Sequence, residues 1–187
     1  MSDPIIYDFN PNNLPEEYLR AIGLITAASA QTEAILQEFM GALLKIDNIQ
    51  NIALTTHMSI PLMIDIIKTL AEIEAPNINE IDKIDELIET AKEAIDKRNT
   101  VAHNALVTHP DTGEVLVHRL SARGSVKLEL RAITVSEIEK DAAAIYEAGV
   151  AITDFMITRG LDPITRTKPL NPPVKRGKKA RSERVSL

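Results

Sequence analysis

The chain has 187 residues, enough for one domain that buries a sizeable core. It contains no cysteine and no tryptophan, and only 3% of its residues are aromatic, which excludes structural disulfides and thiolate metal sites and predicts an aliphatic core. The formal net charge of −6 is unevenly divided, because residues 159–187 hold nine Lys or Arg and two acids, a balance of +7, which leaves −13 for residues 1–158.

The N-terminal segment, residues 1–8, carries acidic residues where a secretory signal carries basic ones. No apolar run approaches the roughly 18 residues that span a bilayer. We therefore expect a soluble, uncleaved, cytoplasmic protein that makes no membrane contact.

Three predicted helices begin with the same signal, an asparagine or threonine followed three residues later by glutamate. The first side chain can accept a hydrogen bond from a free backbone N–H, and the glutamate interacts favourably with the helix dipole. The pairs are Asn13 with Glu16, Asn77 with Glu80, and Thr134 with Glu137.

Apolar residues recur at helical spacing in four segments, which are residues 13–46, 49–73, 80–104 and 135–158. The second segment contains Pro61, which lacks a backbone N–H and should kink or break the helix near Ser59. Small residues in the last segment allow close helix approach. The chain is therefore expected to be mainly α, with an antiparallel four-helix bundle.

Between residues 105 and 131 the apolar period changes from 3.6 residues to 2. Turn-forming sequences at 109–113 and 121–124 separate three short alternating segments. We expect a small antiparallel β-meander inserted between the third and fourth predicted helices.

Residues 161–187 have no hydrophobic period, many prolines and an excess of positive charge. We expect them to form a basic, disordered tail after one helical domain, residues 1–160. Such a tail can bind nucleic acid through phosphates, fold back on the acidic body, or simply solubilise the chain. It has no aromatic residue, so base stacking is not expected.

The third predicted helix ends in Arg98-Asn99-Thr100-Val101-Ala102-His103. Asn99 and His103 share a face that continues a polar stripe, whereas Arg98 falls on the apolar stripe with Ala102. A guanidinium on a buried seam is unfavourable unless it meets an anion or several acceptors, such as a phosphate. An arginine that binds phosphate oxygens and a histidine that exchanges a proton near neutral pH suffice for RNA cleavage without a metal. In this reaction a ribose 2′-OH attacks the adjacent phosphorus.

The segment from Arg98 to His103 resembles the motif of HEPN (higher eukaryotes and prokaryotes nucleotide-binding) domains. These are helical bundles marked by arginine, four to six residues, then histidine near the end of a bundle helix. Asn99 occupies the place next to the arginine where a polar residue is common. The resemblance in architecture extends over the four predicted helices, whereas the resemblance in sequence motif is limited to the six residues 98–103. It implies that the chain is a metal-independent endoribonuclease that uses no cofactor. It also implies a homodimer in which the two motifs meet in one cleft. The implied setting is bacterial phage defence or a toxin–antitoxin system.

By this resemblance Arg98 binds the scissile phosphate, His103 acts as general base or acid, and Asn99 orients the substrate or Arg98. The implied partners are an RNA substrate, a second copy of the chain, and an antitoxin or other defence protein. One position departs from the pattern. In a toxin subgroup paired with a nucleotidyltransferase antitoxin, a modified tyrosine lies two residues after the histidine, where this chain has Ala105.

The same residues also have simpler structural interpretations. Arg98 can extend to solvent and pair with Asp96, Glu93 or an acid of another helix, and His103 is a favourable cation near a helix C-terminus. Some HEPN domains have lost activity, so a non-catalytic dimerisation or scaffold protein is an alternative function, as is a nucleic-acid-binding protein that uses its tail. The other histidines have no partner at ligand spacing and predict no metal site; they are His57, His109 and His118.

Overall fold

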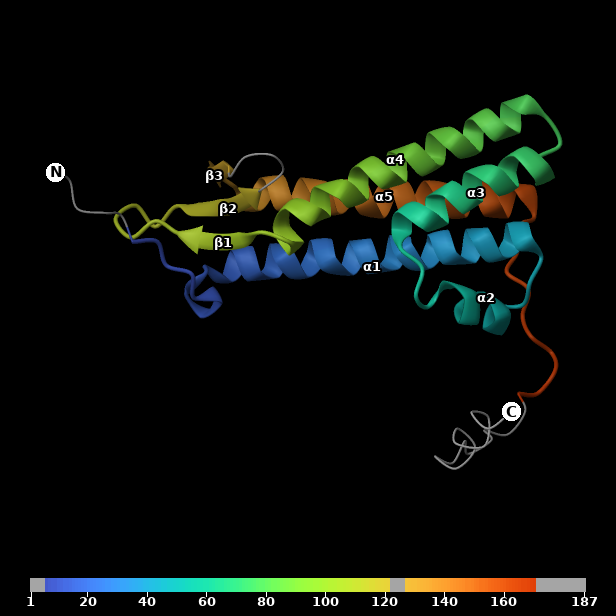
Figure 1. Cartoon of the computed structure of the whole chain (residues 1–187), viewed down its shortest axis with the longest axis horizontal. Helices are drawn as coiled ribbons and strands as arrows, with labels where there is room; N and C mark the ends of the chain where they lie inside the picture. The colour runs from blue at the N-terminus through green and yellow to red at the C-terminus, as the bar shows by residue number, and fades with distance from the viewer. Residues whose placement is uncertain (1–5, 122–126, 171–187) are drawn as a thin grey trace, which may run out of the picture.

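The computed structural model describes residues 6–121 and 127–170. Within these ranges the helices and strands follow in the order α1 (Glu16–Leu44), α2 (Asn48–Thr55), α3 (Ile60–Glu74), α4 (Ile78–Ala102), β1 (Ala105–Thr108), β2 (Val115–Ser121), β3 (Lys127–Ala132) and α5 (Val135–Arg159) (Figure 1). The predicted mainly helical class is confirmed, and a three-stranded antiparallel sheet lies between α4 and α5. Among the described residues, none of the helices combines the length and apolarity needed to cross a bilayer.

Two of the three predicted helix starts are confirmed by side-chain caps. The Asn77 side chain accepts from the backbone N–H of Glu80 at 3.1 Å, and the Thr134 hydroxyl accepts from that of Glu137 at 3.2 Å. The predicted start at Asn13 is wrong, because a 3-10 helix, Pro11–Asn13, precedes α1 and Pro15 occupies the N-cap position without a side-chain hydrogen bond.

The predicted break of the second helix near Ser59 is confirmed, and it divides the segment into α2 and α3. The Ser59 hydroxyl accepts from the backbone N–H of Leu62 at 3.5 Å, so it caps the new helix. Pro61 lies in the first turn of α3, where its missing N–H costs no hydrogen bond and its φ suits the helix.

The break adds one reversal of the chain to those predicted from the sequence. This extra reversal changes the direction of the later helices relative to α1. Tyr18 and Thr32 of α1 donate to the carbonyls of Ile133 and Ile145 at 2.9 Å each, so α1 and α5 run in the same direction. The α4 helix runs against both (Figure 1). The expected antiparallel arrangement of the first and last helices is therefore wrong, since α2 carries the chain back before α3 begins.

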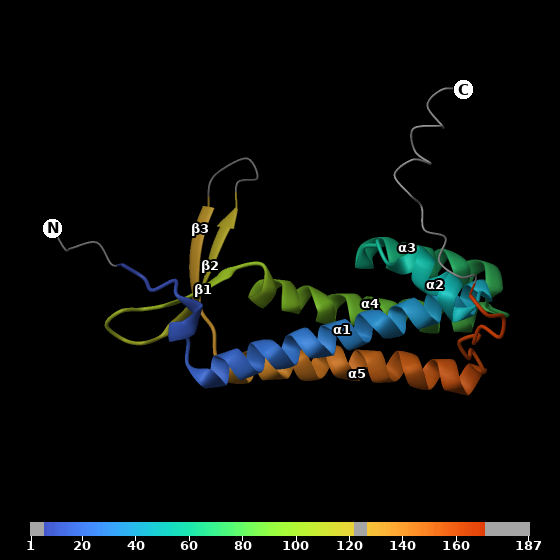
Figure 2. The same ribbon diagram turned by 90° about the horizontal axis from the view of Figure 1, so that it is seen from below.

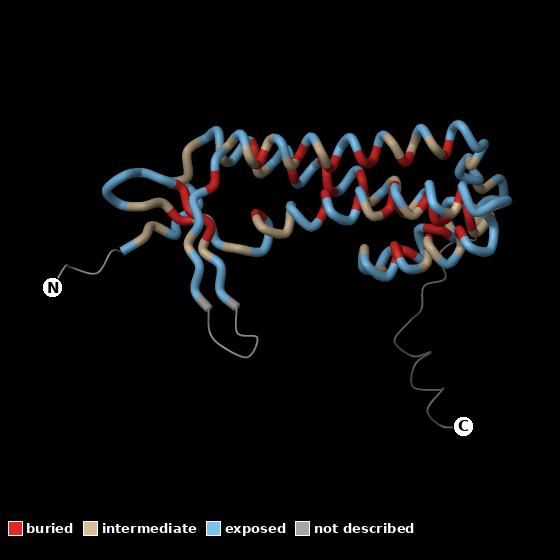
Figure 3. The backbone as a smooth tube through the Cα atoms, turned by 90° about the horizontal axis from the view of Figure 1, so that it is seen from above, coloured by how far each residue is buried: buried red, intermediate tan, exposed pale blue. Residues whose placement is uncertain are grey.

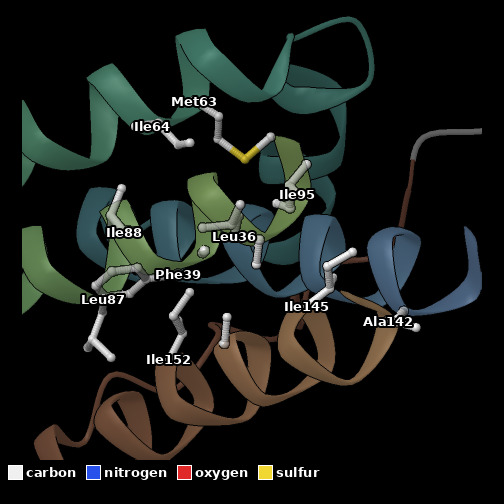
Figure 4. Close-up of a cluster of buried hydrophobic side chains, with 14 of the residues drawn as sticks. Leu36, Phe39, Met63, Ile64, Leu87, Ile88, Ile95, Ala142, Ile145 and Ile152 are labelled. Carbon is white, nitrogen blue, oxygen red and sulfur yellow. The ribbon is translucent and has the colours of Figure 1, made fainter. Parts of the chain in front are cut away.

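The core is aliphatic, as predicted, and lies between α1, α3, α4 and α5. The side chains in Figure 4 come from all four helices and include Leu36, Phe39, Met63, Ile64, Leu87, Ile88, Ile95, Ala142, Ile145 and Ile152. Close approach of α1 and α5 depends on Gly149, since a Cβ there would lie 2.9 Å from the Thr32 hydroxyl. Figure 3 shows that buried residues follow the inward faces of the helices.

The sheet closes one end of the bundle, and α2 and α3 lie at the other end (Figure 2). Its order is β1-β2-β3, and Val115 and Val117 of β2 belong to the helical core. The opposite face of the sheet meets the N-terminal segment, where Phe9 packs edge-on against His118 with ring centroids 5.4 Å apart. Beyond this contact the β2–β3 hairpin stands away from the helices.

The first part of the predicted tail is attached to the corner between α1 and α2. The backbone N–H of Asn48 donates to the Ile164 carbonyl at 2.8 Å, and the Arg166 guanidinium pairs with the Asp47 carboxylate at 2.9 Å. The backbone N–H of Gln50 and, more weakly, the Arg166 guanidinium lower the pKa of Asp47 below its ordinary value. The rest of the predicted tail, residues 171–187, lies outside the described part of the chain.

Candidate functional site

The predicted site residues lie in the last turn of α4 and in the turn that leads to β1. The helix ends at Ala102, two residues before its predicted end, because two contacts satisfy its last carbonyls. The backbone N–H of His103 donates to the Asn99 carbonyl at 3.1 Å, and the Asn104 side chain donates to the Thr100 carbonyl at 2.8 Å. The motif is thus held by helical hydrogen bonds.

Arg98 continues the buried stripe of α4, as predicted. The stripe consists of Ile84, Leu87, Ile88, Ala91, Ala94 and Ile95, all buried. One turn after Ala94 and Ile95 the chain places Arg98, which is half-buried, and then Val101, which is buried. The prediction that Ala102 lies on this stripe is wrong. The stripe winds slowly around the helix, so Val101 occupies the inward position in the last turn.

The Arg98 guanidinium lacks the partners that the simpler interpretation expects. Its Nε atom is buried and has no hydrogen-bond acceptor, and no carboxylate of the described residues forms an ion pair with it. Asp96, a predicted partner, instead accepts from the Asn99 side chain at 3.4 Å. A buried donor without an acceptor costs about 1–3 kcal/mol. An anionic oxygen brought by a ligand or a second chain would remove this cost.

His103 and Asn99 are placed differently from the arginine. His103 is exposed, and its ring makes no hydrogen bond with any residue that the structure describes. Asn99 is half-buried one turn earlier on the same side of the helix. The structure therefore brings together a partly buried cation, an amide and an accessible proton-exchanging group at one helix end.

The polar stripe of α4 upstream of this site contacts α3. Glu89 pairs with Lys92 at 3.6 Å, as predicted, and also with Lys68 of α3. The Lys68 hydrogen bond lowers the pKa of Glu89, and the Glu89 hydrogen bond raises the pKa of Lys68. The Glu89 carboxylate is therefore engaged by two lysines, one on α3 and one on α4 itself.

The other histidines lie outside this cluster. The Nδ1 atom of His109 accepts from the backbone N–H groups of Asp111 and Thr112, so it shapes the turn between β1 and β2. His118 packs on Phe9, and His57 is exposed between α2 and α3. No group of three or more potential metal ligands occurs among the described residues.

Arg119 of β2 lies near the site, although no local sequence pattern predicts it there. The β1–β2 register pairs Ala105 with His118, so Arg119 follows on β2 beside the turn that carries His103. Alternation along β2 could have placed Arg119 on the face of Val117. Its place after the Ala105–His118 pair depends on the strand register, which the sequence pattern left open.

Comparison of the chain with protein-family models, with curated proteins and with solved structures finds no match. Membership of the HEPN superfamily therefore stays a prediction based on the segment from Arg98 to His103.

Proposed function

We propose that this chain is a HEPN-like, metal-independent endoribonuclease that acts as a homodimer. The observation that carries the proposal is the buried, unpaired Nε of Arg98, in the same last turn of α4 that leads to the exposed His103. Arg98 would bind the scissile phosphate, His103 would transfer protons, and Asn99 would orient the substrate or the arginine. These are the roles that the resemblance implies.

The proposed reaction needs only proton transfer and charge stabilisation. A base removes the proton of a ribose 2′-OH, the 2′-oxygen forms a bond to the adjacent phosphorus, and the bond from phosphorus to the 5′-oxygen breaks. An acid then protonates the departing 5′-oxygen, which leaves a 2′,3′-cyclic phosphate and a 5′-hydroxyl. The guanidinium of Arg98 stabilises the negative charge on the phosphate oxygens during the transfer.

The requirement for both a base and an acid favours a dimer. One motif supplies one histidine, and a single imidazole is neutral as a base and protonated as an acid. Two copies that meet at the ends of α4 would supply one His103 for each role and two Arg98 side chains for one phosphate group. A phosphate between them would bind the accessible part of the Arg98 guanidinium, and a turn of the side chain toward it would give the buried Nε an acceptor.

The biological setting follows from the resemblance. We propose a bacterial defence or toxin–antitoxin role in the cytoplasm, in which an antitoxin or another defence protein controls cleavage. Ala105 stands where a regulatory tyrosine would be expected, so a partner would have to act by covering the site or by separating the dimer.

The experiment is RNA cleavage in EDTA by the unaltered chain and by Arg98→Ala and His103→Ala variants. Both variants should lose cleavage while they keep their helical circular-dichroism spectrum. His57→Ala is the matched control, because this histidine is exposed and outside the site, and it should cleave normally. Equal cleavage by all four proteins would contradict the proposal.

A second candidate is a non-catalytic dimerisation or scaffold protein, favoured by an apolar groove between α1 and α5. The groove has a volume of about 360 Å³ and is lined by Leu24, Ala27, Ala28, Gln31, Glu139, Ala142, Ala143 and Tyr146. Leu24 and Tyr146 are about half exposed. In this case Leu24→Glu, a change in the lining of the groove, should disturb the oligomer in light scattering, whereas His103→Ala should leave it unchanged.

A further inference from the structure

The β1–β2 ladder places Arg119 beside the end of α4. Ala105, the first residue of β1, pairs with His118 of β2. Asn104 comes just before this pair and lies outside the ladder. Paired strands lie about 5 Å apart. The residue after His118 is therefore next to the turn formed by His103 and Asn104.

The side chain of Arg119 lies on the face of the sheet that looks toward the helices. Val115 and Val117 are 2% and 3% exposed and belong to the helical core. Successive side chains of a strand alternate between faces, so Arg119 continues the face of Val117 beyond the edge of the core. There it is exposed, on the hairpin that stands away from the bundle in Figure 2.

Arg119 makes no ion pair with any described residue. Its cross-strand partner is Glu129, but the two side chains do not meet as an ion pair. Arg131, on the same face of the hairpin, pairs with Glu137 at 2.7 Å. Arg119 is thus a cation without an ion pair among the described residues, next to the turn that contains His103. The formal net charge of residues 1–158 is −13. Local cations matter most for RNA binding on such an acidic body.

We propose that Arg119 is a second phosphate-binding residue, which holds a single-stranded RNA as it passes from the end of α4 along the inner face of the β2–β3 hairpin. This inference rests on the proposed function of Arg98 and His103. Arg98 would hold the scissile phosphate, and Arg119 would hold a neighbouring phosphate. A single strand fits because the 2′-oxygen must lie opposite the departing 5′-oxygen, and an unpaired backbone adopts this geometry more readily than an A-form duplex.

The test uses the full chain with His103→Ala, which prevents cleavage, and a fluorescein-labelled single-stranded RNA. Anisotropy over a salt series should show that Arg119→Ala weakens binding about fivefold at low salt, as expected for an exposed ion pair. The slope of log affinity against log salt should fall by about 0.7, the value for one phosphate contact on a single strand. Arg119→Lys should restore most of the affinity.

Arg131→Ala is the matched control, because this arginine shares the hairpin face but is already paired with Glu137. It should leave both affinity and salt slope unchanged. With the catalytic histidine present, Arg119→Ala should raise KM and leave kcat nearly unchanged, because the contact is the same in the ground and transition states.

Two outcomes would overturn the inference, and they are distinguishable. If the unaltered chain binds and cleaves RNA but Arg119→Ala has the same affinity, salt slope and KM, the role of Arg119 is excluded and the proposed function stands. If the unaltered chain neither binds nor cleaves single-stranded RNA, the proposed function fails and the inference fails with it.

Discussion

The backbone N–H of His103 donates to the carbonyl of Asn99 at 3.1 Å, so a helical hydrogen bond joins the exposed histidine to the turn that contains Arg98. The separation of arginine and histidine is therefore set by helix geometry. One of the two side chains lies partly in the core and the other lies in solvent. This placement allows the arginine to be rigid and the histidine to be accessible, and each can be tested.

Replacing Arg98 by methionine should stabilise the fold while it removes the proposed activity. The buried Nε lacks an acceptor, and methionine fills similar space without a polar atom, so the free energy of unfolding should rise by about 1 kcal/mol. Urea denaturation measures the change. Lys97→Met is the control, because its exposed pair with Asp141 should contribute no more than about 0.5 kcal/mol. A lower unfolding free energy for Arg98→Met would show that the guanidinium has a partner.

The proposed composite site predicts a nonlinear loss of activity in mixed dimers. If cleavage needs His103 from both copies, an equal mixture with the His103→Ala chain should retain about one quarter of the activity, the fraction of dimers with two intact motifs. If each copy acts alone, about one half should remain. The mixture is made by unfolding and refolding the two chains together, and the initial rate of RNA cleavage is compared at constant total protein.

Gly149 and Gly23 should respond oppositely to alanine. A Cβ at Gly149 would lie 2.9 Å from the Thr32 hydroxyl and 3.0 Å from Ile35, so Gly149→Ala should lower the free energy of unfolding by about 1–3 kcal/mol. A Cβ at Gly23 meets no atom within 4 Å, so Gly23→Ala should raise the free energy by about 0.5–1 kcal/mol through the better helix propensity of alanine. Equal effects of the two changes in urea denaturation would contradict the packing of α1 on α5.

The attachment of residues 164–166 should depend on pH through Asp47. The Gln50 N–H and, more weakly, the Arg166 guanidinium make the pKa of Asp47 lower in the folded chain than in the unfolded chain, and only the Arg166 contribution stabilises the attached segment, in full above the unfolded pKa, about 3.9. The stabilisation is lost as the pH falls through the lowered folded pKa. The protection factor of the Asn48 amide, whose N–H donates to Ile164, should therefore fall at acid pH when each exchange rate is divided into the intrinsic rate at the same pH. Arg166→Ala should lower this protection factor already at neutral pH, whereas Lys168→Ala should not.

Removal of the basic segment should separate its role from that of Arg98. A chain that ends at Leu170 keeps the contacts of Ile164 and Arg166 and lacks residues 171–187, which hold six Lys or Arg and one acid. We expect it to retain Arg98-dependent cleavage, with weaker binding at low salt, because the tail offers only phosphate contacts. Complete loss of RNA binding on this truncation would favour the alternative of a nucleic-acid-binding protein that uses its tail.

Much of the secondary structure could be predicted because its signals are local. The caps at Asn77 and Thr134, the break at Ser59 and the change of period after α4 each depend on residues within one or two turns. The first helix start at Asn13 failed for a local reason as well, since Pro15 takes the capping position. The place of Arg98 on the apolar stripe was predicted by the same periodicity.

The candidate site could be predicted only in part. Arg98, Asn99 and His103 lie at a helix end, as periodicity predicted. Asp96 and Glu93 were predicted as partners of Arg98, and neither forms an ion pair with it among the described residues. Arg119 was not predicted, because its position depends on a strand pairing.

The amino-acid sequence by itself determined the helices, the inserted strands, the aliphatic core and the inward position of Arg98, because periodicity and capping act between neighbours along the chain. Only the tertiary structure decided that α1 and α5 run in the same direction, that the Nε atom of Arg98 is left without an acceptor, and that Arg119 follows the last pair of the β1–β2 ladder, Ala105 with His118. These features depend on contacts between residues far apart in the sequence, where packing and register select one arrangement from several with the same local pattern.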